Sequence, residues 1–118
     1  MPRSTPDAPT LLKAAVKYLE EELMPSLSDY HRFQTRVTIN VLNTVRRELE
    51  MRPAQAAGER ERLAAILGHP GEVEALNDEL AEKLRTGIIV IDHPGLRVHI
   101  RQSLADALAI NNPRWLNR

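Results

Sequence analysis

The sequence predicts an all-α protein, folded as a compact bundle of about five helices with a short extended connector at residues 88–91. Apolar residues recur at spacings of three and four in successive segments, which is the helical period. Prolines and glycines separate these segments at positions where helices end. A chain of 118 residues fits one domain, so we expect a flexible tail over residues 1–8 and a single helical domain over residues 9–118.

The first expected helix follows this polar tail. Asp7 is a suitable N-cap, and Pro9 stands in the first turn, where its missing N–H costs little. Pro25 closes the helix, because the residue before a proline avoids the α region. The apolar stripe of this helix consists of Leu12, Ala15, Val16, Leu19 and Leu23.

The second expected helix is the longest uninterrupted pattern, over about residues 29–51. Ser28 or Asp29 caps it, and Pro53 closes it. Ile39 is an exception to the pattern, because it lies on the polar side. One arc of the helix holds Tyr30, Phe33, Val37, Val41, Val45 and Leu49. The opposite arc holds Arg32, Arg36, Asn40, Asn43 and Arg47.

Three further helices complete the expected bundle. The third covers residues 53–67 and stops at Gly68, and the fourth covers about residues 71–86 and stops at Gly87. The fifth covers about residues 95–110. Their apolar stripes are, in order, Leu63, Ile66 and Leu67; Val73, Leu76, Leu80 and Leu84; and Leu96, Ile100, Leu104, Ala107 and Leu108.

The connector Ile88–Ile91 is a run of four β-branched residues, which prefer extended geometry. No second strand-like run exists in the chain, so an isolated strand here would lack a partner. Two interpretations remain. The segment is an extended connector buried against the bundle, or it pairs with its own copy in a second subunit.

Composition excludes several classes of function. The chain has no cysteine, which removes disulfides, cysteine-ligated metals and thiol nucleophiles. Its 16 basic and 16 acidic residues cancel, whereas nucleic-acid binders usually carry a basic excess. No signal peptide stands at the N-terminus and no apolar run approaches the length of a membrane span. We therefore expect a cytoplasmic protein that binds neither nucleic acid nor membrane.

Catalytic patterns are also missing, so the sequence favours a binding role over an enzyme. The four histidines stand outside the spacings of known metal-binding helices, and no glycine-rich phosphate loop occurs. His99 and Ser103 are four residues apart and could touch on a helix, but such a pair is far more often packing than a catalytic dyad. We expect no catalytic residue, no metal and no cofactor.

The arginine face of the second helix (Arg32, Arg36, Asn40, Asn43 and Arg47) is the most informative surface. Guanidinium groups bind phosphates and carboxylates in bidentate fashion, so this face could contact an anion or a partner protein. The plainer interpretation is a solvated face or one that is ion-paired to an acidic helix. Asparagines within a helix are poor helix formers and favour an interface over catalysis.

Trp115 is the only tryptophan, and it follows the helix stop at Asn111, Asn112 and Pro113. We expect it to fold back onto the bundle. If it is exposed instead, it becomes a candidate interaction anchor for a partner.

Several segments together carry a family resemblance, namely residues 11–25, 33–42, 59–68, 76–77 and 108–116. Their order resembles a small bacterial all-helical domain family of unknown function. The resemblance covers nearly the whole chain from about residue 9. It implies proteins that stand alone or lie beside, or fused to, kinase-like (aminoglycoside-type) phosphotransferases, often near acyl-CoA dehydrogenase genes. It implies no catalytic residues.

Two hypotheses of function follow. The first is a non-catalytic accessory or protein-interaction module, which assists a phosphotransferase or an acyl-CoA-handling enzyme and forms a homo-oligomer through its apolar helix faces. The second is a small-ligand binder or enzyme that takes an anionic ligand, such as a phosphate or CoA ester, on the arginine face.

Overall fold

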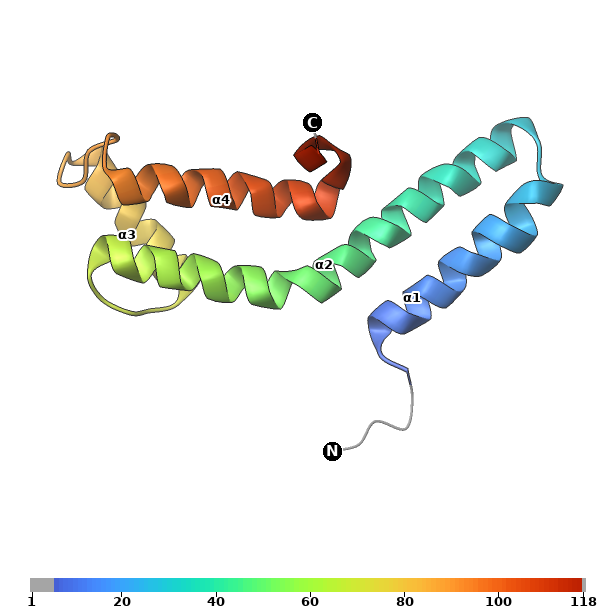
Figure 1. Cartoon of the computed structure of the whole chain (residues 1–118), viewed down its shortest axis with the longest axis horizontal. Coiled ribbons are helices and arrows are strands. Elements are labelled where there is room, and N and C mark those ends of the chain that lie inside the picture. Colours follow the sequence, from blue (N-terminus) through green and yellow to red (C-terminus); the bar gives the residue numbers. More distant parts are fainter. Residues whose placement is uncertain (1–5, 118) are drawn as a thin grey trace. The chain divides into compact units, whose positions relative to one another are not determined.

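The computed structural model describes residues 6–117 and contains four α-helices (Figure 1). All regular structure among these residues is helical, which confirms the all-α class. The α-helices are α1 (Ala8–Lys17), α2 (Asp29–Leu67), α3 (Val73–Arg85) and α4 (Pro94–Asn111). Shorter helical turns are η1 (Tyr18–Leu23), η2 (Met24–Ser26) and η3 (Pro113–Asn117). Among the described helices, none is both long and apolar enough to cross a membrane.

The number of helices corrects the prediction of about five. The segments expected at residues 29–51 and 53–67 form one helix of 39 residues with Pro53 inside it. Proline removes one backbone donor and crowds the carbonyl four residues earlier, which ends most helices but only kinks others. The chain divides into two compact units at this same proline, residues 1–52 and residues 53–118.

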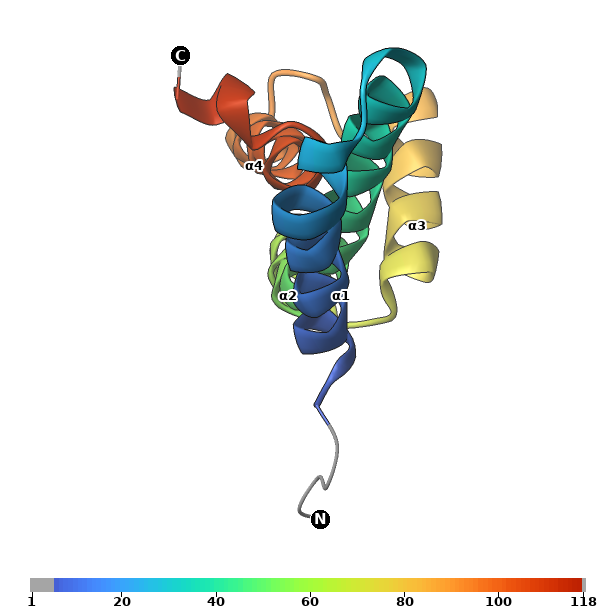
Figure 2. The same cartoon turned by 90° about the vertical axis from the view of Figure 1, so that its right-hand side faces the viewer.

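The first unit pairs α1 with the N-terminal half of α2. The two helices lie side by side and run in opposite directions (Figures 1 and 2). Asp7 caps α1 as predicted, because its carboxylate accepts from the Thr10 backbone N–H at 3.0 Å. Most of the expected tail over residues 1–8 lies outside the described residues. The buried apolar side chains of this unit are Val16 and Ile39.

The second unit builds its core from three helices. Leu63 of α2, Leu76 and Leu80 of α3, and Leu96 of α4 form one buried cluster. Ile66, Leu67, Val73 and Leu84 pack around it, as the stripes of the third and fourth expected helices predicted. Gly68 and Gly87 have positive φ angles of 86° and 79°, the left-handed conformation that ends a helix.

Two helices turn a different face inward from the one the periodicity suggested. In α2 the buried residue is the exception, Ile39, which is 4% exposed. The six residues of the apolar arc, Tyr30 to Leu49, are 40–66% exposed. In α4, Leu96 is buried as predicted, but the predicted inner residues Ile100 and Leu104 are exposed and His99 is buried. Periodicity identifies an apolar face, but it does not say which neighbour covers it.

The connector at residues 88–91 forms no strand, because the backbone bends at Ile88 and Ile89 and a turn begins at Ile91. Only Ile89 packs against the core, and its backbone N–H is held by the Lys83 carbonyl at 3.1 Å. Ile88, Val90 and Ile91 are exposed, so the segment is not the buried connector that we expected. Pairing with a second subunit stays untested. Only eight residues connect the end of α3 to the start of α4, and the chain reverses direction within them. This short connection leaves little room for an extended segment.

Candidate functional site

The outer face of α4 is an open surface that mixes apolar and basic side chains. Ile91, Arg97, Ile100, Arg101 and Leu104 line a shallow cavity of about 410 Å³. All five side chains are exposed, and Leu104 is 63% exposed. We call this surface the α4 face. Apolar side chains flanked by two guanidinium groups are suited to an amphipathic ligand that carries negative charge.

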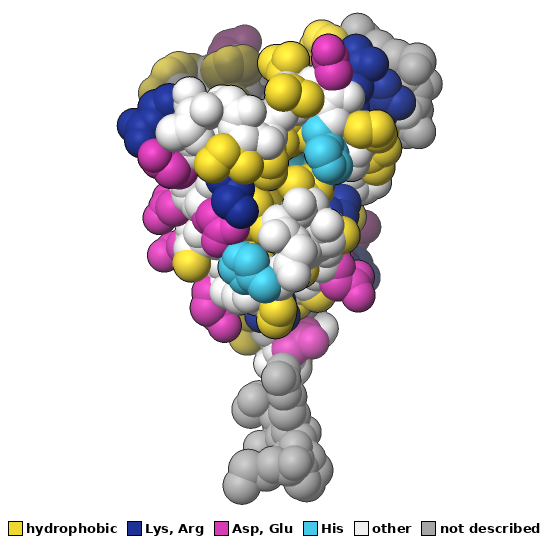
Figure 3. All heavy atoms as spheres, turned by 90° about the vertical axis from the view of Figure 1, so that its left-hand side faces the viewer, with side chains coloured by type: hydrophobic (Ala, Val, Ile, Leu, Met, Phe, Trp, Pro, Cys, Tyr) yellow, Lys and Arg dark blue, Asp and Glu magenta, His cyan; other side chains and the backbone are white. Residues whose placement is uncertain are grey.

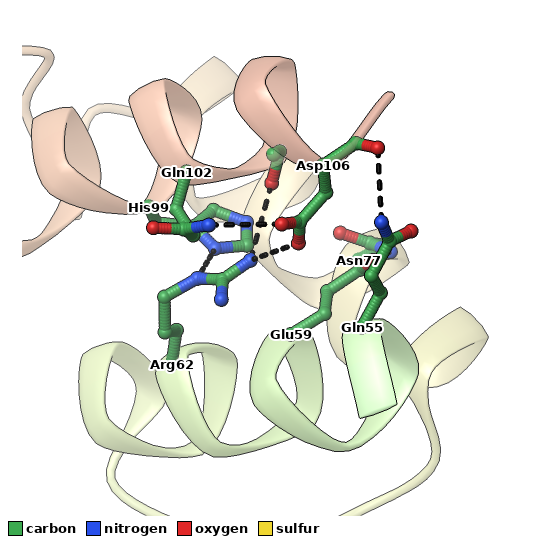
Figure 4. A network of polar contacts seen from close by, with 8 residues as sticks. Gln55, Glu59, Arg62, Asn77, His99, Gln102 and Asp106 are labelled. Atoms are coloured by element: carbon green, nitrogen blue, oxygen red, sulfur yellow. Dashed lines mark hydrogen bonds and ion pairs between the residues drawn. The ribbon is translucent and has the colours of Figure 1, made fainter. Parts of the chain in front are cut away.

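The opposite side of α4 faces α2 and carries polar groups. Arg62 of α2 reaches across to three of them (Figure 4). Its Nε donates to Nδ1 of His99 at 3.1 Å, and one terminal nitrogen lies 3.5 Å from Oγ of Ser103 and 3.8 Å from a carboxylate oxygen of Asp106. His99 is only 6% exposed. We call these four residues the Arg62 network.

Further hydrogen bonds fix Asp106 within this network. Its other carboxylate oxygen accepts from the Gln102 amide at 2.8 Å, and its backbone carbonyl accepts from the Gln55 amide at 3.0 Å. Nearby, the Asn77 amide of α3 donates to Glu59 of α2 at 3.0 Å (Figure 4). Polar contacts therefore join α2 to both of the other helices of the unit, beside the leucine core.

The contacts of the Arg62 network determine the protonation of His99 and the partner of Ser103. Burial lowers the pKa of His99, and the neighbouring Arg62 charge lowers it further. Because Nδ1 accepts the Arg62 proton, the neutral ring carries its own proton on Nε2. Ser103 contacts Arg62, which can only donate a hydrogen bond to it. The described side chains of His99 and Ser103 share no hydrogen bond with each other. A serine nucleophile needs a base within reach, so this arrangement is not a catalytic dyad.

The structure places the five predicted residues of the α2 arginine face along one helix. Arg32, Arg36 and Asn40 are exposed on the helix, whereas Asn43 and Arg47 are half-buried. A terminal nitrogen of Arg47 donates to Oγ1 of Thr44 at 3.2 Å. The α4 face and a second open cavity of about 420 Å³, which Arg60 and Glu72 help to line, both belong to residues 53–118. Neither is lined by the predicted anion-binding residues.

His93 and His69 hold local structure. His93 caps α4, where its Nδ1 accepts from the backbone N–H groups of Gly95 and Leu96 at 3.1 and 3.3 Å. His69 lies 2.8 Å from a carboxylate oxygen of Glu79. Among residues 6–117, no three histidine or acidic side chains come together as a metal site. On the end of the second unit that carries α3, histidine, acidic and apolar side chains intermingle at the surface (Figure 3).

Trp115 is not folded fully back onto the chain. It lies in η3 and is 54% exposed, and its neighbour Leu116 is exposed as well. The expected docking is therefore incomplete, and about half of this residue's surface remains accessible.

Residues 25–115 match the model of a protein family described as a domain of unknown function, DUF6285. The chain belongs to this family. The match covers most of the length, although the opening segment at residues 11–24, which contributed to the resemblance, lies outside it. Searches of curated proteins and of solved structures give no match.

All residues of the α4 face and the Arg62 network lie inside the DUF6285 region. Sequence reasoning missed Arg62, Asp106 and Gln55. A signal was present, because Gln55, Glu59 and Arg62 stand at positions i, i+4 and i+7, and so do His99, Ser103 and Asp106. Two polar rows at helical spacing, each on a helix that also has an apolar row, indicate a polar seam between the helices.

Proposed function

We propose that this DUF6285 domain is a non-catalytic accessory module that binds another protein through its α4 face. The observation that carries the proposal is the orientation of α4. This helix buries His99 at 6% exposure and leaves Leu104 at 63% exposure. Contiguous exposed apolar patches that are rimmed by polar residues mark interaction sites.

The chemistry of the α4 face specifies the kind of partner segment. Ile100 and Leu104 offer an apolar strip, and Arg97 and Arg101 stand beside it. An amphipathic helix with apolar residues on one side and glutamate or aspartate along the edge matches both features. Arginine pairs with carboxylates through two parallel hydrogen bonds, which adds orientation to the apolar contact.

We assign this partner segment to a phosphotransferase or an acyl-CoA-handling enzyme encoded beside the domain, in the cytoplasm. The family resemblance carries that choice of partner, and the absence of a described catalytic arrangement supports an accessory role. The alternative, an anionic small molecule on the α2 arginine face, has weaker support. Its five residues are spread along one helix and line neither of the two cavities described above.

The test is co-expression of the full chain with the phosphotransferase encoded nearest to its gene, and separately with the nearest acyl-CoA-handling enzyme, followed by size-exclusion chromatography with light scattering. We expect a complex of defined stoichiometry. The double variant Arg97→Glu and Arg101→Glu should abolish it, because charge reversal places carboxylates against carboxylates. Finding no complex with either enzyme class would overturn the proposed role.

Arg36→Glu is the matched control, because Arg36 is an exposed arginine on α2 outside the α4 face. It should leave the complex intact. A complex lost in Arg36→Glu and retained in the double variant would contradict binding at the α4 face. For the small-molecule alternative, a thermal shift produced by inorganic phosphate or CoA that disappears in Arg36→Ala would favour the arginine face instead.

A further inference from the structure

The N-terminal half of α2 carries an apolar row that remains about half-exposed. The row consists of Tyr30, Phe33, Val37, Val41, Val45 and Leu49, which we call the α2 row. After Tyr30 and Phe33, its members follow one another at intervals of four residues. All six are 40–66% exposed. An apolar row of this length is a candidate interaction surface.

The geometry of the unit explains why α1 leaves the row open. Ile39 is nine residues beyond Tyr30, which at about 100° per residue places it on the opposite side of the helix. That opposite side is the one packed in the unit, because Ile39 is 4% exposed. Lys13 of α1 also reaches Glu50 at 3.6 Å. Helix α1 therefore packs on the side of α2 that lies opposite the α2 row.

The size of the row fits a modest protein interface. Aromatic side chains carry roughly 150–250 Å² each, so six half-exposed apolar side chains present on the order of 500 Å². This area lies within the range of about 300–600 Å² for the largest apolar patch on a monomer, a patch that is often functional. Two such rows facing each other would cover about 1,000 Å², the lower limit for a specific interface before the flanking polar groups are counted.

We propose that the occupant is a second copy of this chain, which packs its own α2 row against the first in a two-fold symmetric dimer. Ridges of residues four apart interdigitate with ridges of the same kind, at a crossing angle of about −50°. Two identical rows therefore satisfy the packing requirement, and a two-fold axis brings the same patch of both chains together. Small valines at the centre allow close approach, and the larger Tyr30, Phe33 and Leu49 lie at the ends.

Charge does not oppose this arrangement. The row contains no charged residue, and Glu48 on the same arc is ion-paired with Arg52 at 3.5 Å in its own chain. The formal net charge of zero removes long-range repulsion between two copies. The inference is independent of the proposed partner site, because the α2 row and the α4 face lie on different helices.

The first test measures mass by sedimentation equilibrium over a range of protein concentrations. We expect the full chain to reach twice the mass of one chain, and Val41→Asp to remain monomeric at every concentration. Val98→Asp is the matched control, because Val98 lies on α4 and is 62% exposed, compared with 56% for Val41. It should keep the dimer. A wild-type monomer, or a dimer lost in Val98→Asp but kept in Val41→Asp, would overturn the proposal.

The second test needs no disruptive substitution and uses the absence of cysteine from the chain. Val41→Cys places a single thiol near the centre of the row, where a two-fold axis brings it close to its own copy. Mild oxidation should give a covalent dimer in high yield, whereas Val98→Cys should give little. Equal yields of covalent dimer from Val41→Cys and Val98→Cys would refute the dimer. The dimer would also be refuted if Val41→Cys were monomeric and its thiol were protected from alkylation, because the rest of the same chain would then cover the row. If Val41→Asp still forms the phosphotransferase complex, partner binding at the α4 face does not depend on dimerisation through the α2 row.

Discussion

At the scale of single residues, His99 links the stability of the fold to pH. Burial and the Arg62 charge hold its folded-state pKa below its ordinary value of about 6.5. The unfolded chain therefore binds a proton first as the pH falls. We expect the free energy of unfolding contributed by His99 to be fully present above pH 6.5 and to decline progressively below it. Urea denaturation at intervals between pH 5 and pH 8 measures this slope.

His99→Gln separates this effect from other titrations, because glutamine does not titrate and can still accept from Arg62. The acid slope should become shallower in this variant. His69 acts in the opposite direction, since its contacts with the Pro70 carbonyl and Glu79 raise its pKa, so its contribution is present at low pH and lost as the pH rises through that raised pKa. The comparison is cleanest in a His69→Gln background. An unchanged acid slope after His99→Gln would contradict the assignment.

His93 gives a second prediction at this scale. Its ring nitrogen accepts from two backbone N–H groups at the start of α4. His93→Ala should lower the free energy of unfolding by about 1 kcal/mol, the usual cost of losing an N-cap. His93→Asn should recover most of that loss, because asparagine is among the best N-caps. Chemical denaturation at pH 7 measures both, and equal losses in the two variants would mean that packing rather than capping matters at this position.

At the scale of elements, the orientation of α4 predicts very different costs for two leucines on the same helix. Leu96 is fully buried in the leucine core, whereas Leu104 is exposed. Leu96→Ala should destabilise the chain by about 2–5 kcal/mol through lost burial and a cavity. Leu104→Ala should change stability by about 0.5 kcal/mol or less. Chemical denaturation measures both losses. The periodicity of the sequence placed both residues inward, so equal large losses would restore that first orientation.

The elements also separate what could be predicted from sequence and what could not. Gly68, Gly87 and the Asp7 cap were predictable because each acts through its own backbone and nearest neighbours. The continuation of α2 through Pro53 was not, because a proline inside a helix depends on what the flanking turns gain by continuing. The burial of Ile39 and His99 was not predictable either, since it depends on where α1 and Arg62 lie in space.

The candidate site, like the fold, was only partly predictable from the sequence. The arginine face was visible as a row of residues, but a row becomes a site only where a second element closes over it. The α4 face was hidden because Ile100 and Leu104 have the composition of core residues. Only the packing of α4 through His99 and Asp106 assigns them to the surface.

At the scale of the whole molecule, the two units have unequal cores, which predicts unequal resistance to opening. The unit formed by residues 53–118 buries a cluster of four leucines, whereas the described part of residues 1–52 buries only Val16 and Ile39. Regions with few buried apolar contacts open at lower free energy than the core. Native-state hydrogen exchange should therefore give the slowest amides near Leu63, Leu76 and Leu80 and faster ones in α1 and the first half of α2.

Native-state hydrogen exchange at several protein concentrations also tests whether the chain self-associates. If a second copy covers the α2 row, protection of the amides between residues 30 and 49 should rise with protein concentration, because the dimer binds only the folded unit. Protection near Leu63 should change much less. Val41→Asp supplies the monomer baseline and should show no concentration dependence in either region. Protection that is equal on both sides of Pro53 at low concentration would contradict the unequal cores, whatever the oligomeric state.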